Sequence, residues 1–363
     1  PLQVVGSLRC VQEPAATLES SKDLAKEFCL RHGIPTAESR CVRTGDEARS
    51  AVRDLGLPVV FKADGLAAGK GVLIVANEAE AEEAIQILFQ DRRFGSASDR
   101  VVIEECLQGE ELSFIALSDG KRALTFASSK DYKRIGEDDT GLNTGGMGAH
   151  SPAGVLTPDL GAEILEQVVR ATIRGMEADN RPFVGVLYCG LMLTADGHRV
   201  LEYNVRFGYP EAKPLVLRFQ DDLLPVLASV AAGRFEMQRL NFRKEASACV
   251  VLAAAGYPGD PIKGDPIAGI EEANARQAVT VFQAGTKLVD GQLVSAGGRV
   301  LNVCATGPTL KDALKRAYDA VGDIRWSNKV CRHDIGRRVV ARGRVRFVRI
   351  LEPAGHGRIG PVG

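Results

Sequence analysis

The segment that most constrains the fold of this chain is FKADGLAAGKGV at residues 61–72, a glycine-rich loop between two apolar runs. Glycine lets a backbone bend and approach a ligand closely, and N–H groups exposed in such a loop can bind phosphate oxygens. Lys62 and Lys70 add two ammonium groups, which suit a polyphosphate. A Walker A loop is excluded, because the glycine spacing is too short and a β-branched strand, not a helix, follows. The segment predicts a nucleotide loop over phosphates, with an ordinary hairpin as the alternative.

A second informative segment is LEYNVR at residues 201–206, which reads as a strand. Because side chains two residues apart share a face of a strand, we expect Glu202, Asn204 and Arg206 to point the same way. A carboxylate and an amide oxygen are hard ligands that suit Mg²⁺, which normally keeps waters and substrate phosphates as its other ligands. Arg206 would then hold a phosphate or a carboxylate. The alternative is a polar strand that faces solvent.

An apolar strand that ends in carboxylates forms a third segment, VVIEECLQGEE at residues 101–111. The turn after this strand can offer backbone donors and acceptors to the edge of an adenine. Glu111, at the start of the next strand, can offer a carboxylate to ribose hydroxyls. A charged β-turn is the alternative.

The fourth segment joins DYKR at residues 131–134 to DDTGLNTGGMG at residues 138–148. Its glycines, together with Asn and Thr, predict a loop of backbone donors, and Lys133 and Arg134 supply positive charge nearby. Such a loop suits an anionic substrate or a phosphoryl group in transfer. A long mobile surface loop is the alternative, although loops of this length in compact domains are often functional.

The composition of the 363 residues narrows the class of protein. Apolar residues make up 45% and charged residues 25%, as in ordinary globular domains, and the formal net charge is zero. We therefore expect no nucleic-acid partner, and no membrane partner either, because no apolar run reaches the ~18 residues of a membrane span. The eight cysteines contain no C-x-x-C pair, which indicates reduced thiols in the cytoplasm. Because the chain starts at Pro1 without an initiator Met, we expect a fragment or a processed product.

The pattern of caps, apolar runs and turns predicts an α+β chain with two main parts. Helices are expected from Ser20 or Ser21, from Thr44, from Asn77, over 158–179 and over 221–232, and strands at 59–62, 100–104, 111–117, 123–128, 184–194 and 199–205. From about residue 246 short strands alternate with Gly/Pro turns and predict a smaller α+β domain. The tail after residue 331 is rich in arginine, and Arg342, Arg344 and Arg346 alternate as on one face of a strand. We expect this tail to be a solvated, partly disordered end, and nucleic-acid binding by the tail is the alternative.

Taken together, the segments closely resemble the glycinamide ribonucleotide synthetases (phosphoribosylamine–glycine ligases) of purine biosynthesis. The resemblance runs from Leu18 to Arg338. It rests on the segments above and on AAGYPGD at 254–260, AGTK at 284–287 and GGRV at 297–300. It implies an ATP-grasp fold, in which two α+β lobes hold ATP, followed by a small C-terminal α+β domain. The implied boundaries are a remnant of an N-terminal domain or a linker at 1–19, the ATP-grasp domain at 20–235 with a mobile lobe at about 58–125, the C-terminal domain at 246–340 and a basic tail at 341–363.

The resemblance also implies a role for each matching residue. It assigns ATP phosphates to Lys62, Gly69, Lys70 and Gly71; adenine and ribose to Glu104, Glu105, Cys106, Leu107 and Glu111; Mg²⁺ or Mn²⁺ to Glu202 and Asn204; catalysis to Lys133 and Arg206; and the substrates to Asp131, Asn143, Thr144, Gly145, Gly146, Met147, Gly148 and Glu211. The implied reaction has two steps. The glycine carboxylate takes the γ-phosphoryl group of ATP, and the amine of phosphoribosylamine then displaces phosphate to form the amide.

The chain departs from the family pattern at four positions in these segments. Tyr209 stands where Asp is expected, Tyr132 where His is expected, Leu142 where Pro is usual and His150 where Tyr is usual. The family's N-terminal domain is also expected to be essentially absent. The alternative to an active ligase is therefore a truncated or degenerate member that binds Mg-ATP without turnover. A third reading, an ATP-grasp ligase with another acceptor, would need a different loop at 139–152.

Overall fold

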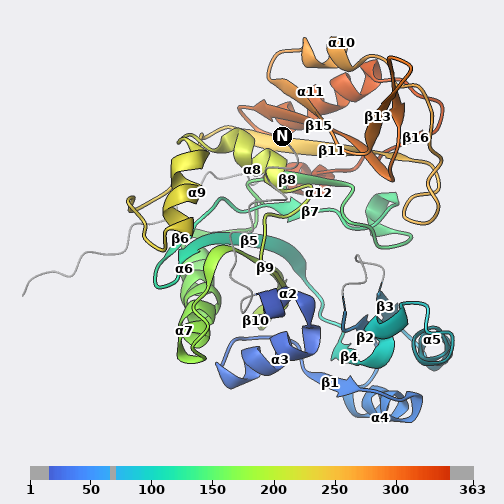
Figure 1. Ribbon diagram of the computed structural model, residues 1–363, viewed down its shortest axis with the longest axis vertical. Coiled ribbons are helices and arrows are strands. Elements are labelled where there is room, and N and C mark those ends of the chain that lie inside the picture. Colours follow the sequence, from blue (N-terminus) through green and yellow to red (C-terminus); the bar gives the residue numbers. More distant parts are fainter. Residues whose placement is uncertain (1–15, 66–70, 344–363) are drawn as a thin grey trace, which may run out of the picture.

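The computed structural model describes residues 16–65 and 71–343. Figure 1 shows three regions: a small lobe at the lower right, a second sheet with its helices at the left, and a C-terminal region at the top. In the described part of the chain, no helix is long and apolar enough to cross a membrane. The predicted residues Gly69 and Lys70 lie outside the described residues, as do Arg344 and Arg346.

The small lobe is a four-stranded antiparallel sheet in the order β1-β4-β2-β3, covered by helices on one face. Its elements are β1 (Ser39–Val42), α4 (Gly45–Leu55), β2 (Val59–Ala63), β3 (Val72–Val75), α5 (Glu78–Ile85) with the π-helical turn Gln86–Gln90, and β4 (Val101–Glu105). The side chains of Thr44 and Asn77 cap α4 and α5 by accepting hydrogen bonds from backbone N–H groups, as their sequence positions predict. Phe61 and Ile103 are fully buried beneath the helices and anchor the core of the lobe.

The second sheet has the order β10-β9-β5-β6. Its strands are β5 (Glu110–Asp119), β6 (Ala123–Thr125), β9 (Val184–Thr194) and β10 (Gly197–Asn204), and the helices around it are α2 (Thr17–Ser20), α3 (Lys22–Arg31), α6 (Pro158–Ile164), α7 (Ala171–Ala178), α8 (Ala212–Arg218) and α9 (Leu223–Ala231). A π-helical segment, Leu165–Arg170, joins α6 to α7. Separate apolar clusters form on the two faces of the sheet. Burial on both faces fixes the register of β5 and β9, because a one-residue slip would exchange their faces.

The C-terminal region is built on a sheet in the order β12-β15-β11-β8-β7, with β16 paired to β11. Its elements are β7 (Lys130–Asp131), β8 (Gly148–Ser151), β11 (Ala246–Ala254), α10 (Ile270–Asn274), β12 (Val279–Gln283), the hairpin β13 (Thr286–Val289) and β14 (Gln292–Ser295), β15 (Arg299–Gly307), α11 (Leu310–Asp323), β16 (Lys329–Val330) and α12 (Arg337–Ala341). Strands β7 and β8 come from the ATP-grasp part of the sequence. The predicted C-terminal domain therefore shares its sheet with the segment that carries the glycine loop.

Most predicted helices and strands are confirmed, whereas two expectations about organisation differ from the structure. The sheet of the small lobe spans residues 39–105, so β5 and β6, expected within a lobe at 58–125, belong to the second sheet instead. The arginine alternation that begins at Arg342 does not mark a strand at this residue, because Arg342 follows the helix α12. Arg332 is not part of a solvated end, because its side chain is only 1% exposed. It donates hydrogen bonds to the carboxylate of Asp334, which compensates for burying the positive charge.

Candidate functional site

Lys62 and Glu104 lie side by side on β2 and β4. Lys62 Nζ lies 2.8 Å from Glu104 Oε2 and also donates to the carbonyl of Leu201 at 3.1 Å. Lys26 from α3 lies 3.3 Å from the other oxygen of the same carboxylate. Glu104 is 2% exposed and paired with two ammonium groups. Its assignment to adenine or ribose stays a prediction, and it requires one of these ion pairs to open.

The segment after β4 connects the two sheets of the ATP-grasp part. The backbone N–H of Glu105 donates to Glu38 O at 3.1 Å, and that of Cys106 donates to Pro58 O at 3.2 Å. These two N–H groups are therefore already used within the lobe. Recognition of an adenine edge by residues 105–107 would depend on Leu107 and on the carbonyl groups of the segment.

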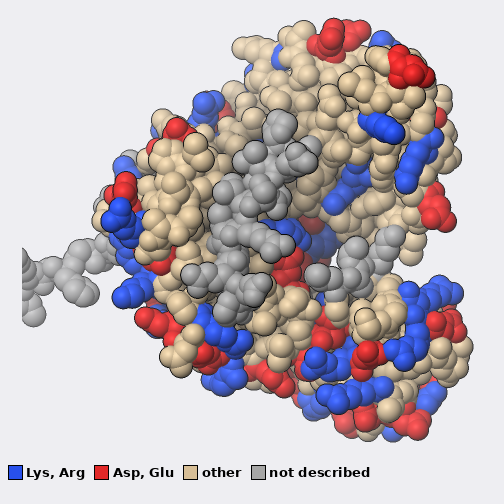
Figure 2. All heavy atoms as spheres, viewed as in Figure 1, with Lys and Arg blue, Asp and Glu red and all other residues tan. Residues whose placement is uncertain are grey.

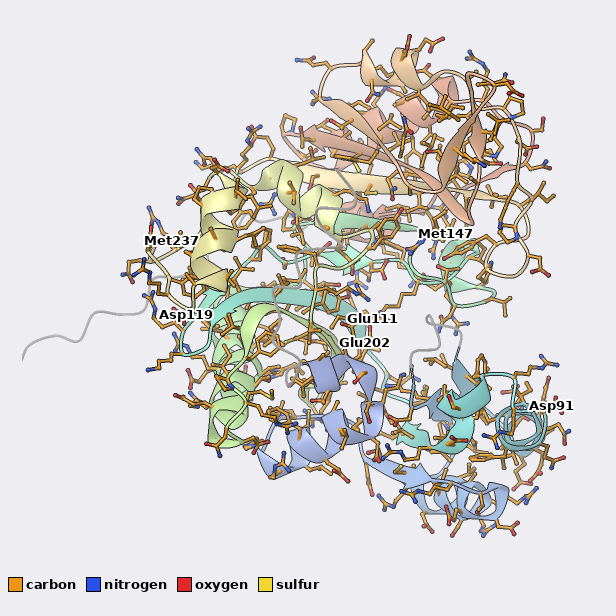
Figure 3. The ribbon with its side chains drawn as sticks, viewed as in Figure 1. Asp91, Glu111, Asp119, Met147, Glu202 and Met237 are labelled. Atoms are coloured by element: carbon orange, nitrogen blue, oxygen red, sulfur yellow. The ribbon has the colours of Figure 1, made fainter. Side chains whose placement is uncertain are left out.

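Lys133 brings together two carboxylates from different strands of the second sheet. Its ammonium lies 3.2 Å from Glu111 on β5 and 3.6 Å from Glu202 on β10. Figure 3 shows Glu111 and Glu202 next to each other, on the side of the sheet that faces the small lobe. Burial opposes the charge of Lys133, but Glu111 and Glu202 raise its pKa well above the ordinary value. A residue that the sequence placed in a loop thus forms the charged centre of the site.

The strand β10 carries the predicted metal ligands, and Arg206 follows it. Arg206 donates to the amide oxygen of Asn204 at 2.9 Å and to Glu19 at 3.1 Å, which shows that Asn204 and Arg206 lie on one side. The Glu19 carboxylate also accepts the backbone N–H of Val205 at 2.9 Å. Sequence reasoning missed Glu19, because its only signal was an isolated carboxylate near a helix start.

Glu202 and Asn204 have the donor chemistry that Mg²⁺ prefers. Burial raises the pKa of Glu202, but Lys133, Lys62 and Lys22 outweigh this effect and lower it, so the carboxylate is ionised. No group of three or more His, Cys, Asp or Glu side chains forms a metal cluster within residues 16–65 and 71–343. The ionised carboxylate of Glu202 and the amide oxygen of Asn204 fit a cation that takes two oxygen ligands from the protein and the rest from phosphates and water.

The glycine loop at residues 143–148 is held from the C-terminal region. Tyr257 accepts a hydrogen bond from the N–H of Gly145 at 2.9 Å, and Arg299 on β15 donates to the Gly145 carbonyl. Within the loop, Thr144 Oγ1 donates to the Lys133 carbonyl at 2.7 Å and accepts from the N–H of Gly146 at 3.0 Å. The predicted backbone-donor loop is thus ordered by its neighbours, and these fixed contacts argue against a long mobile surface loop.

The remaining predicted loop residues take different places around this region. Asn143 forms an isolated bridge with Arg134, Met147 is fully buried, and Gly148 begins β8. In the nucleotide loop Gly71 is described, and its carbonyl accepts the N–H of Ala63 at 2.9 Å.

Figure 2 shows that the surface is hollowed between the small lobe and the C-terminal region, with acidic and basic side chains in the hollow.

Asp131 and Glu211 each carry a buried carboxylate oxygen that has no hydrogen-bond partner in the described structure. Glu211 is 2% exposed, and its other oxygen accepts from the hydroxyl of Tyr188 at 2.8 Å. Burial and the charge of Glu211 raise the pKa of Asp131 well above its usual range. The loop passes close to this pair, because a Cβ on Gly146 would lie 2.6 Å from Asp131 Oδ1.

Tyr209, which stands where the family pattern has Asp, packs against two cations. The Lys213 ammonium lies 3.1 Å from the centre of the ring, and the Arg299 guanidinium lies 3.9 Å from it. The phenol oxygen accepts a hydrogen bond from Asn302 at 2.7 Å, and Arg299 also donates to the Tyr209 carbonyl at 3.3 Å. A ring with a negative face therefore lies where the family pattern expects a carboxylate.

The other departures are Tyr132, His150 and Leu142. The hydroxyl of Tyr132 accepts the N–H of Gly336 at 2.8 Å, which ties β7 to the start of α12. His150 is fully buried, and burial lowers its pKa to about 4. Leu142 is largely exposed. Tyr132 and His150 therefore have structural roles, whereas nothing in the structure explains Leu142.

Two lobes of antiparallel sheet, with charged side chains between them, define the ATP-grasp class. Solved structures confirm this fold. The chain superimposes on N5-carboxyaminoimidazole ribonucleotide synthetase from Thermotoga maritima with a TM-score of 0.62 at 20% identity, covering 86% of this chain and 73% of that one. The sequence matches the phosphoribosylglycinamide synthetase ATP-grasp (A) domain over residues 20–212 and the C domain of the same enzyme over residues 247–338. The chain belongs to the phosphoribosylglycinamide synthetase family.

Relatives that match about nine tenths of this chain support this membership. The chain is 48% identical to phosphoribosylamine–glycine ligase of Agrobacterium fabrum over 328 residues, covering 90% of this chain and 77% of the relative. It is 49% identical to the protein of the same name from Xanthomonas axonopodis pv. citri, covering 91% of this chain and 77% of the relative. The crystal structure of phosphoribosylamine–glycine ligase from Thermotoga maritima matches with a TM-score of 0.81 at 34% identity, covering 92% of this chain and 84% of that chain. The resemblance predicted from the sequence is confirmed.

Proposed function

We propose that this chain is a carbon–nitrogen ligase that joins glycine to 5-phosphoribosylamine at the expense of ATP, a step of purine biosynthesis. Its relatives carry the name of this activity, and both of its family domains belong to the enzyme. The observation that carries the proposal is the contact of Lys133 with Glu111 and Glu202 beside the glycine loop. This contact places one ammonium group and two carboxylates close together in the site.

The chemistry has two balanced steps. A glycine carboxylate oxygen attacks the γ-phosphorus of ATP, and the bond to the β-phosphate oxygen breaks to give glycyl phosphate and ADP. The amine of phosphoribosylamine then attacks the acyl carbon, phosphate leaves, and the amine loses a proton. These steps need positioning and charge neutralisation more than a covalent nucleophile. We assign phosphate contacts to Lys62 and Lys70, and contacts with the transferring group to Lys133 and Arg206.

Glu202 and Asn204 would hold Mg²⁺, which would neutralise phosphate charge and orient the phosphates when bound. Mn²⁺ has a similar preference for oxygen ligands. In the structure Lys133 approaches Glu202, and Arg206 binds the oxygen of Asn204. Both cationic side chains would have to turn from these ligands toward the phosphates. The cytoplasmic location predicted from the cysteine pattern remains a prediction.

Thermal unfolding with ATP, with and without Mg²⁺, tests the nucleotide site. Binding to the native state raises stability by about 2.7 kcal/mol at a hundredfold excess over Kd. We expect a Mg²⁺-dependent rise in the wild type, which Glu202→Ala abolishes, whereas the exposed Asp54→Asn retains it. No rise in a cooperatively folded wild type would contradict the proposal. A rise without glycine-dependent release of ADP in the presence of phosphoribosylamine would favour the alternative, a member that binds Mg-ATP without turnover.

A further inference from the structure

The side chain of Tyr188 on β9 is buried where an apolar cluster meets a carboxylate of the site. Its ring packs in the cluster that contains Ile115 and Leu215, and the residue is 3% exposed. Its hydroxyl lies 2.8 Å from Oε1 of Glu211 and 2.8 Å from Oγ of Ser113. Buried hydroxyl groups normally have hydrogen-bond partners, but here one partner is a side chain that the family resemblance assigns to the substrates.

The carboxylate of Glu211 fixes the direction of these hydrogen bonds. Burial and the negative charge of Glu211 raise the pKa of Tyr188 well above its ordinary value, so the phenol keeps its proton. A phenol has a single O–H group, which donates to the carboxylate oxygen. In the contact between the two hydroxyl groups, Ser113 is therefore the donor and Tyr188 the acceptor. The three groups form one chain of donors that ends at Glu211, and hydrogen bonds in such a chain strengthen one another.

Tyr188 is the closest donor to the Glu211 carboxylate among the residues that the structure describes. Within those residues Ser113 also donates to Oε1, at the longer distance of 3.4 Å, and Oε2 has no partner. The carboxyl group also lies tight against the backbone of Gly208, where an added Cβ would come within 2.7 Å of it. The orientation of Glu211 therefore depends on the Tyr188 hydroxyl and on close packing, and not on an ion pair.

Strand pairing also places Tyr188 beside the predicted metal ligands. It lies directly opposite Asn204 on β10, so the two side chains share one face of the sheet. Gly190 lies opposite Glu202 on the same face. A Cβ on Gly190 would lie 3.0 Å from Cγ of Glu202 and 3.5 Å from Cε1 of Tyr188, so the glycine leaves room for both side chains. Tyr188 thus connects the strand of the metal ligands to the segment before α8.

We propose that Tyr188 is a positioning residue of the ligase, whose hydroxyl holds the carboxylate of Glu211 in the orientation that the substrates require. This inference rests on the proposed function and adds a residue that acts through Glu211. The hydroxyl fixes one carboxylate oxygen and leaves the other for the substrate. Because the hydrogen bond depends on the phenol oxygen and not on the ring, removal of that oxygen alone should misplace Glu211.

Steady-state kinetics of Tyr188→Phe test this role, because the variant removes the hydroxyl and keeps the ring. We expect kcat/KM to fall by about 10- to 100-fold for the substrate that Glu211 contacts, glycine or phosphoribosylamine, as for loss of a hydrogen bond to a charged group. The Kd of a non-hydrolysable ATP analogue should stay unchanged.

Tyr203→Phe is the matched control for the loss of a buried hydroxyl. Tyr203 is also 3% exposed, but it lies in the cluster on the other face of the sheet, where its hydroxyl is 2.8 Å from Thr172 Oγ1. We expect Tyr203→Phe to lower the melting temperature about as much as Tyr188→Phe does and to keep wild-type kinetics, because both variants lose one buried hydrogen bond.

A double-mutant cycle with Glu211→Ala shows whether Tyr188 acts through Glu211. If it does, Tyr188→Phe should lower kcat/KM much less in the Glu211→Ala background than in the wild type. Glu211→Asp, which withdraws the carboxylate by one methylene group, replaces Glu211→Ala if that variant does not fold.

Three results would overturn the inference: wild-type kcat/KM in Tyr188→Phe, an equal loss in both backgrounds of the cycle, or an equal loss of activity in Tyr203→Phe. If the wild type makes amide and one of these results is found, the proposed function survives without this role for Tyr188. If the wild type makes no amide, both fail.

Discussion

The ring of Tyr209 is expected to stabilise the junction between the ATP-grasp part and the C-terminal region. Tyr209→Phe removes the hydroxyl that accepts from Asn302 at 2.7 Å, which leaves that donor unpaired at a cost of about 1–3 kcal/mol. Tyr209→Leu also removes both cation–π contacts, at about 0.5–2 kcal/mol each. The leucine variant should therefore be less stable than the phenylalanine variant by about 1–4 kcal/mol.

Urea unfolding measures this difference with two probes. Trp326 is the single tryptophan of the chain and lies in the core of the C-terminal region, so its fluorescence reports that region, while circular dichroism reports the whole chain. Lys213→Met is the matched variant, because it removes one cation and keeps the ring. Burial lowers the pKa of Lys213 to about 8, so the coupling of Tyr209 to Lys213 in a double-mutant cycle should be present at pH 7 and lost well above pH 8. Equal urea midpoints for Tyr209→Leu and Tyr209→Phe would refute the role of the ring.

Three further predictions follow from buried groups. Tyr209→Asp should not raise the ligase rate, because an ion pair between the new carboxylate and Arg299 would only replace the contacts that Tyr209 already makes with Arg299. A higher rate in a coupled ADP assay would show that Tyr209 limits turnover. His150 has its pKa lowered from 6.5 to about 4, so its contribution to stability is complete above pH 6.5 and is lost as the pH falls through 4. In the wild type this group should lower the free energy of unfolding by about 3 kcal/mol as the pH falls from 6.5 to 4. His150→Gln should remove this pH dependence from the free energy measured by urea unfolding, and an unchanged pH profile would contradict the prediction. Arg332→Met should cost about 3–5 kcal/mol, because the buried carboxylate of Asp334 loses its partner; Arg332→Lys should cost less, and equal melting temperatures for both would argue against this pair.

The sequence by itself determined the local structure and the family. Caps such as Thr44 and Asn77 and the alternation along β10 depend on neighbours within a few residues, so they can be read without tertiary contacts. The segments around residues 61–72 and 202–211 were specific enough to identify the family. The ATP-grasp fold followed from this resemblance, and the comparisons confirm it.

Only the tertiary structure decided which residues meet. Glu111 on β5, Lys133 in the segment after β7 and Glu202 on β10 are separated in the sequence, and their contact depends on how these elements pack. Arg299 and Tyr257 come from the C-terminal region, and nothing near them in the sequence indicates that they hold the loop at 143–148. The boundary of the small lobe also required the structure, because strand pairing is a long-range property that local pattern does not encode.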